Sequence, residues 1–150
     1  MTPQQPQAPR INPEYQKNFT PSTDIIWASA QRETPGVDKG KFFGGLARLL
    51  QNPRNKLLQV KNTVFLIMGK GPGIIEFHTF STAGPKELIA DAKEAIAAVK
   101  KAGAKKLISY SPDARFNQLI QATGLPWKIT QSQMTIGGKA MPAYRYELDL

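Results

Sequence analysis

The stretch that decides the fold runs from Gly73 to Tyr110 and reads GIIEFHTFSTAGPKELIADAKEAIAAVKKAGAKKLISY. Its first part, Gly73 to Ser81, is dense in β-branched and aromatic residues, which is typical of a buried strand. From Lys86 to Ala102, apolar residues recur at intervals of three and four, the spacing that places one stripe along a helix. Gly103 then ends the helix, and Leu107 to Tyr110 is a second β-prone run. The stretch therefore predicts a β-α-β unit.

Composition limits the classes of protein to consider. A chain of 150 residues with 41% hydrophobic residues can bury one core, and we expect one domain from residue 22 to residue 150. The absence of cysteine excludes disulfides, thiolate metal sites and thiol catalysis, and it fits synthesis in the cytoplasm. No apolar run approaches the roughly 20 residues that span a bilayer, so we expect a soluble protein.

The net charge of +9 predicts attraction to polyanions such as nucleic acid, an acidic protein face or a phosphate-bearing ligand. Basic residues stand in runs of no more than two, which favours a solvated basic surface over a dedicated nucleic-acid groove. The single histidine, His78, lacks carboxylates at ligand spacing, which argues against a metal site. Nucleic-acid binding stays open as an alternative through four aromatic residues with basic neighbours: Tyr110, Trp127, Tyr144 and Tyr146.

The N-terminal segment, Met1 to Pro21, is rich in proline and glutamine and cannot sustain the hydrogen bonds of a helix or sheet. We expect an extended arm. Such a segment is either a disordered tail or an arm ordered on a partner surface. In the second case Ile11, Tyr15 and Phe19, spaced at four-residue intervals, would anchor it to a neighbouring protein subunit.

The rest of the chain predicts alternating short elements. Asp24 to Arg32 is compatible with a strand or a short helix. Lys41 to Gln51 is predicted to be helical, and its internal Gly44-Gly45 pair indicates a close approach to another backbone. The other predicted elements are a strand hairpin (Lys56 to Met68 with Gly73 to Ser81), a helix (Ala114 to Thr123) and a terminal hairpin (Trp127 to Ile136 with Met141 to Leu148).

This order of elements resembles the GNAT acyltransferase fold from about Asp24 to Leu150. The resemblance implies an α/β (α+β) domain whose mixed, mostly antiparallel sheet is flanked by helices. In that family a loop of the pattern Gln/Arg-x-x-Gly-x-Gly/Ala follows the central strand and holds the coenzyme A pyrophosphate through backbone N–H groups. The matching positions in this chain are Ser81, Thr82, Ala83, Gly84 and Lys86.

The loop departs from the family pattern at two positions, and a proline at an unspecified position removes a donor as well. Gly84 fits, but Ser81 replaces Gln/Arg and Lys86 replaces the second small residue. Pro85 also removes one N–H donor from a site that works through converging donors. By resemblance, this is a poor pyrophosphate loop.

The second signature of the family lies on the short helix. It has an Asn that opens the helix, a Tyr seven residues later that protonates the leaving thiolate, and a Gly-Phe at the end. Asp113, Ile120 and Gly124-Leu125 take these positions, and an isoleucine cannot donate a proton. The family often places a catalytic base on the central strand, where Glu76 or His78 would stand. These two residues share one sheet face, although solvent-facing polar residues would show the same pattern.

Two degraded signatures favour a non-catalytic GNAT-like protein. Similar diverged GNAT-like proteins occur among virion components of tailed bacteriophages, so the leading hypothesis is a virion structural protein whose N-terminal arm docks on neighbouring subunits. It would be made in the cytoplasm and end in the virion, with no cofactor. The alternative is an active acyl-CoA-dependent N-acyltransferase that binds acetyl-CoA at Gly84, uses Glu76 or His78 as base, and lets water replace the tyrosine.

Overall fold

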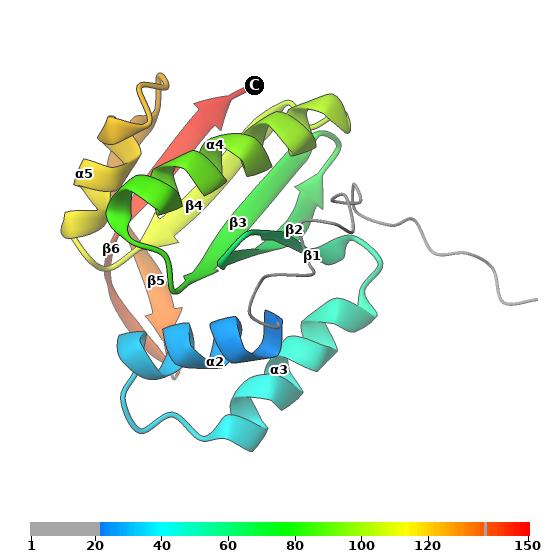
Figure 1. The fold of residues 1–150 in the computed structure, drawn as a ribbon, viewed down its shortest axis with the longest axis vertical. Coiled ribbons are helices and arrows are strands. Elements are labelled where there is room, and N and C mark those ends of the chain that lie inside the picture. The colour runs from blue at the N-terminus through cyan, green and yellow to red at the C-terminus, as the bar shows by residue number, and fades with distance from the viewer. Residues whose placement is uncertain (1–21, 137) are drawn as a thin grey trace, which may run out of the picture.

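The computed structural model describes residues 22–136 and 138–150. The predicted arm and its anchors Ile11, Tyr15 and Phe19 lie outside the described residues. Figure 1 shows the ten elements, in the order α2 (Ser22–Glu33), α3 (Lys39–Gln51), β1 (Asn55–Val60), β2 (Thr63–Gly71), β3 (Ile74–Ser81), α4 (Pro85–Lys101), β4 (Lys106–Ser111), α5 (Arg115–Ala122), β5 (Lys128–Ile136) and β6 (Lys139–Asp149).

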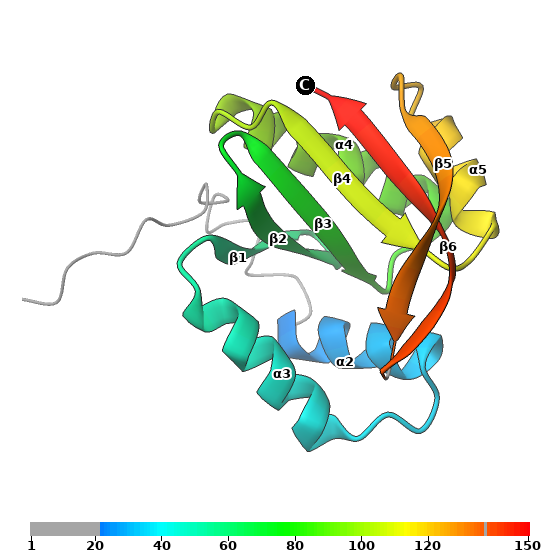
Figure 2. The same cartoon turned by 180° about the vertical axis from the view of Figure 1, so that it is seen from behind.

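The six strands form one sheet in the order β1-β2-β3-β4-β6-β5. Every neighbouring pair is antiparallel except β3 and β4, which are parallel and are joined by α4. Both views show β3 and β4 running in the same direction at the middle of the sheet (Figures 1 and 2). The predicted mixed, mostly antiparallel sheet and its central β-α-β unit are therefore confirmed.

Helix α4 covers one face of the sheet, and its apolar stripe explains why. Ala95, Ile96 and Val99 recur at helical spacing and are buried. They pack on side chains that alternate along the strands, among them Phe65, Phe77 and Leu107. This core holds the second half of α4 on the sheet, and the helix begins four residues after β3 ends.

Helices α2 and α3 pack on the opposite face. The uncertain segment Asp24 to Arg32 is helical, because Ile25, Ile26 and Ala30 are buried at helical spacing and face Val64, Leu66 and Phe80 on the sheet. The two isoleucines are 0% and 1% exposed, so α2 is held by a full core contact. Alternation along β3 places Glu76 and His78 on this same face as Phe80.

Helix α3 begins where Asp38 accepts a hydrogen bond from the Lys41 N–H at 2.8 Å, an N-cap that satisfies one free donor. The prediction that another backbone approaches closely at Gly44-Gly45 is wrong. A Cβ atom built at either glycine would meet nothing within 4 Å, because this side of the helix faces open space.

Helix α5 is held against the terminal hairpin by Tyr146 of β6. The Tyr146 side chain is 0% exposed, its hydroxyl bonds to the Asn117 Oδ1, and its ring meets Phe116 edge-on at 5.3 Å between centroids. Burial and nearby acidic groups raise the pKa of Tyr146 to about 12. Among the helices of the described part of the chain, none is both long enough and apolar enough to cross a membrane.

Candidate functional site

The two parallel strands separate at one end and form a fork. The β3–β4 pairing runs from Ile74 opposite Lys106 to Phe77 opposite Ser109. Beyond that point β3 continues paired with β2 alone, and β4 continues paired with β6 alone. We call the opening between the two strands past Phe77 and Ser109 the fork. Backbone polar groups at such an opening need partners, which an extended ligand can supply.

Ser109 closes the apex of the fork. Its hydroxyl donates to the carbonyl oxygen of Phe77 at 3.1 Å, and the side chain is buried. This bond ties β4 to β3 at the last paired residue. The position of the apex is therefore fixed by a side chain as well as by the sheet.

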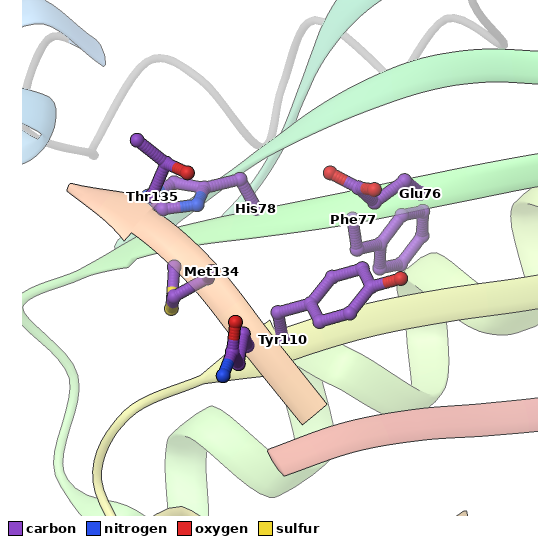
Figure 3. A pocket seen from close by; sticks show the side chains of 7 residues that line it. Glu76, Phe77, His78, Tyr110, Met134 and Thr135 are labelled. Carbon is purple, nitrogen blue, oxygen red and sulfur yellow. The ribbon is translucent and has the colours of Figure 1, made fainter. Parts of the chain in front are cut away.

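A cavity of about 240 Å³ lies beside the fork on the α2–α3 face. Figure 3 shows side chains from three strands around it. Glu76 and His78 come from β3, Tyr110 comes from β4, and the hairpin strand β5 crosses in front. The full lining is Glu76, Phe77, His78, Tyr110, Gln133, Met134 and Thr135.

The structure thus brings Glu76 and His78 to one cavity and adds residues that sequence reasoning did not assign to it. Tyr110 could have been found from the β-α-β prediction, because parallel pairing places the end of β4 beside the end of β3. The contribution of Gln133, Met134 and Thr135 depends on the twist of the terminal hairpin, which leaves no local signal in the sequence.

Glu76 has the environment of a carboxylate base. Its side chain is 21% exposed, and burial raises its pKa above the ordinary glutamate value. The Lys70 ammonium, 3.9 Å from Glu76 Oε1, opposes this rise. A carboxylate with a raised pKa is a stronger base than an exposed one, yet it is still able to ionise.

His78 lies in a different environment. Its ring centroid is 4.8 Å from that of Phe80, and burial lowers its pKa below 6.5. The imidazole is therefore neutral at pH 7 and a weaker base than an exposed histidine. Burial thus shifts the two pKa values toward each other, raising that of Glu76 and lowering that of His78.

The lowered pKa of His78 predicts a loss of stability in acid. Because the folded pKa lies below the unfolded value of 6.5, the unfolded chain takes up the proton first as the pH falls. The contribution is fully present above pH 6.5 and declines below it. Urea denaturation at pH 7.5 and 5.5 should show a larger drop for the wild type than for His78→Gln. Equal drops in the two proteins would contradict this assignment.

The second part of the site is the loop between β3 and α4. Gly84 is the N-cap residue, but it has no side chain to cap the helix, and Pro85 occupies the first helical position. The first bond inside the helix runs from the Leu88 N–H to the Gly84 carbonyl oxygen. The N–H groups of Lys86 and Glu87 precede that bond and have no intrahelical acceptor, so they are free to bind an anion.

The predicted loop residues do not all face the same way. The Thr82 N–H donates to the Asn62 carbonyl oxygen at 3.1 Å, and the Ala83 N–H donates to the Ser81 Oγ at 3.0 Å. These two donors are therefore used inside the protein. What can hold a phosphate is the start of α4 together with the Lys86 ammonium. The loop fits a phosphate-bearing ligand with fewer donors than the family pattern supplies.

The open space at Gly84 supports that fit. A Cβ built there would meet nothing within 4 Å, and the backbone angles, φ −69° and ψ 168°, suit any residue. The glycine is not required by the chain's own packing. A ligand that approaches the helix start would be the neighbour that uses the space.

The short-helix signature is absent in the structure as it is in the sequence. Ile120 is buried in the core under α5 and has no proton to give. Asp113 is tied to Arg115, with 2.8 Å between Oδ2 and Nη2, and this pairing lowers the Asp113 pKa.

Two further expectations concern other ligand classes. Within residues 22–136 and 138–150, no three His, Asp or Glu side chains gather in a way that could hold a metal ion. Of the four aromatic residues considered for nucleic-acid binding, Tyr146 is fully buried and Tyr110 lines the cavity. Tyr146 is therefore not available to stack on a base.

No protein-family model and no curated protein matches the sequence. The fold is similar to a GNAT family acetyltransferase from Elizabethkingia anophelis with acetyl-CoA bound (12% identity, 89% of this chain and 94% of that chain, TM-score 0.55). It is similar to a phosphinothricin acetyltransferase of the GNAT superfamily from Sinorhizobium meliloti in complex with AcCoA (12%, 85% and 80%, 0.57). A third similar structure is the ribosomal-protein-alanine N-acetyltransferase from Brucella melitensis (12%, 88% and 98%, 0.58). This chain has a GNAT-like fold.

These matches contradict the leading hypothesis from the sequence, a non-catalytic virion protein. All three are with acetyltransferases, and two of those structures hold acetyl-CoA. The preference for a protein without a cofactor is weakened in the same way, because acetyl-CoA, which the alternative hypothesis included, is bound in two of these similar structures. At 12% identity the comparison establishes the GNAT-like fold, and it favours the alternative hypothesis of an acyl-CoA-dependent N-acyltransferase.

Proposed function

We propose that this protein is an acyl-CoA-dependent N-acyltransferase. The observation that carries the proposal is the fork between β3 and β4, with a carboxylate of raised pKa beside its apex and an open helix N-terminus at the end of β3. A long, phosphate-bearing thioester needs such a combination: anion binding at one end and a proton acceptor at the other.

The start of α4 would hold the pyrophosphate of the coenzyme. The free N–H groups of Lys86 and Glu87 and the helix dipole favour negative charge, and the Lys86 side chain adds a full positive charge. With Thr82 and Ala83 turned inward and Pro85 lacking a donor, fewer bonds are available than in the family's loop. We therefore expect binding in the micromolar range and weaker than that of GNAT enzymes with the full loop.

Glu76 is assigned as the general base. An amine attacks a thioester only as the free base, so a proton must leave it, and the Glu76 carboxylate at the cavity can accept that proton directly or through one water. The bound coenzyme supplies the activated acyl carbonyl. Because Ile120 cannot serve as acid, water at the open side of the fork protonates the departing thiolate.

Isothermal titration calorimetry with acetyl-CoA tests the proposal directly. We expect saturable binding with a Kd of about 10 to 100 µM, corresponding to about −5.5 to −7 kcal/mol. A thiol-release assay against a panel of primary amines should then identify acceptors. No heat of binding at millimolar acetyl-CoA would overturn the proposal. A second titration of the ligand-free protein with 3′,5′-ADP, the nucleotide part of coenzyme A, shows whether that part alone accounts for the binding.

A further inference from the structure

Helix α4 contains a buried carboxylate that the proposed reaction does not use. Asp91 is 1% exposed and faces Thr63 of β2 from the second turn of the helix. Its Oδ1 is the one buried side-chain nitrogen or oxygen in the described part of the chain that has no hydrogen-bond partner. Burying a carboxylate with one oxygen unpaired is unfavourable, so packing alone does not explain the residue.

The other oxygen of Asp91 begins a chain of hydrogen bonds. The Thr63 hydroxyl donates to Asp91 Oδ2 at 2.8 Å, and the Thr63 and Ser81 hydroxyl oxygens are 2.7 Å apart. A hydroxyl has one proton to donate, and that of Thr63 is directed to the carboxylate, so Ser81 must donate to Thr63. The Ser81 oxygen is then left as an acceptor, and it receives the Ala83 N–H at 3.0 Å.

The carboxylate therefore sets the direction of every bond in the chain. Without it, the Ser81 proton could turn to the Asn62 carbonyl oxygen, which lies 3.4 Å away. A hydroxyl that donates toward an anion is also a stronger acceptor, because successive hydrogen bonds polarise one another. The bond that holds the Ala83 N–H is thus strengthened by a charge that lies on the next element.

The same loop position is fixed from a second side by α2. The Ser81 N–H donates to the Ser29 Oγ at 3.2 Å, and the Arg32 guanidinium donates to the Ser81 carbonyl oxygen at 2.8 Å. Three elements, α2, β2 and α4, therefore converge on the last residue of β3. All hydrogen-bonding groups of Ser81 are engaged where the loop toward Gly84 begins.

We infer that Asp91 is a positioning residue for the phosphate-binding end of the site, acting through Thr63 and Ser81. By holding the Ala83 N–H inward, it sets the path of the chain into Gly84 and so the direction in which the start of α4 points. The inference rests on the proposed function for what the loop binds. The conformation of the loop itself can be tested without any ligand.

Thr63→Val is the variant of choice, since it keeps the shape of the side chain and removes the hydroxyl that links Asp91 to Ser81. Amide hydrogen exchange of the ligand-free protein, read by NMR, should be about tenfold faster at Ala83. The Kd for coenzyme A should rise about tenfold as well. Asp91→Asn keeps an oxygen that can accept from Thr63 but loses the charge, so its Ala83 exchange rate and its Kd should lie between those of the wild type and Thr63→Val.

Thr123→Val is the matched control. Thr123 is also buried, and its hydroxyl makes hydrogen bonds at the end of α5, away from the loop. It should lower the melting temperature without changing Ala83 exchange or the Kd by more than about twofold.

The outcomes distinguish the positioning role of Asp91 from the assignment of the loop to coenzyme A. Unchanged Ala83 exchange in Thr63→Val would overturn the positioning role, whatever happens to the melting temperature. Equal losses in Thr63→Val and Thr123→Val would do the same, because they would reflect general destabilisation. Faster exchange at Ala83 in a protein whose wild type shows no binding of coenzyme A would support the positioning by Asp91 and overturn the assignment of the loop to that ligand.

Discussion

Replacing Glu76 with glutamine should lower kcat for acyl transfer by about a hundredfold to ten-thousandfold, the contribution expected of a general base. Glutamine keeps the size and hydrogen-bonding shape of the side chain but cannot accept the proton of the amine. The Kd for acetyl-CoA should change little, because the phosphates lie at the other end of the site. Steady-state thiol release and calorimetry on the same preparation measure the two quantities.

The pH profile gives an independent reading of the same residue. Burial raises the pKa of Glu76 above 4.5, so activity should fall as the pH drops through a value above 4.5, where the carboxylate takes up a proton. Glu147→Gln is a matched control, since Glu147 is a half-buried glutamate of β6 that pairs with Lys106 at 3.0 Å. We expect its kcat to stay within about threefold of the wild type. A full loss in His78→Gln with retained activity in Glu76→Gln would move the base to the histidine.

Gly84→Asp should have opposite effects on stability and on ligand binding. The backbone at Gly84 suits any residue, and an aspartate there would cap α4 and complement its dipole. We expect a gain of about 1 kcal/mol in the free energy of unfolding. The same carboxylate would stand where the pyrophosphate binds, so the Kd for acetyl-CoA should rise at least tenfold by charge repulsion.

Gly84→Ala separates charge from bulk in that experiment. It also removes a flexible glycine, so it should raise the free energy of unfolding by about 0.4 to 1 kcal/mol. Its effect on the Kd should be smaller than that of aspartate. If aspartate stabilises the protein and leaves the affinity unchanged, the start of α4 is not the phosphate site.

The sequence was most informative where one periodicity extends over many residues. The apolar stripe of α4 and the run of β-branched and aromatic residues in β3 predicted both elements, because each pattern extends over most of its element. Ile25 and Ile26 left α2 undecided, since two adjacent apolar residues fit a strand or a helix. The prediction of a close backbone approach at Gly44-Gly45 failed for a related reason. A glycine permits another backbone to come close but does not show that one does.

The candidate site could be predicted less completely from the sequence, because it depends on contacts between residues that are distant in the chain. Glu76 and His78 could be placed on one face by counting along β3. The end of the β3–β4 pairing at Phe77 and Ser109 has no signature, and the inward turn of the Ala83 N–H depends on Thr63 and Asp91. Judging the loop and the short helix by their motifs led to a non-catalytic hypothesis, since a motif shows which residues are present but does not show that the fork persists.

The parallel pairing of β3 and β4 also joins two halves of the chain whose other strand pairings are mostly local in sequence. The antiparallel strands β1 to β3 are joined by short connections, and β5 and β6 are neighbours both in sequence and in the sheet, so each group can form from local contacts. The two parallel strands meet over only four residues each, and only after the crossover through α4 has closed. The two halves therefore meet at the β3–β4 pairing, which ends at the fork. A ligand bound in the fork would contact both halves and make their separation less frequent. Native-state hydrogen exchange of the β4 amides should then be slower with the ligand than without it.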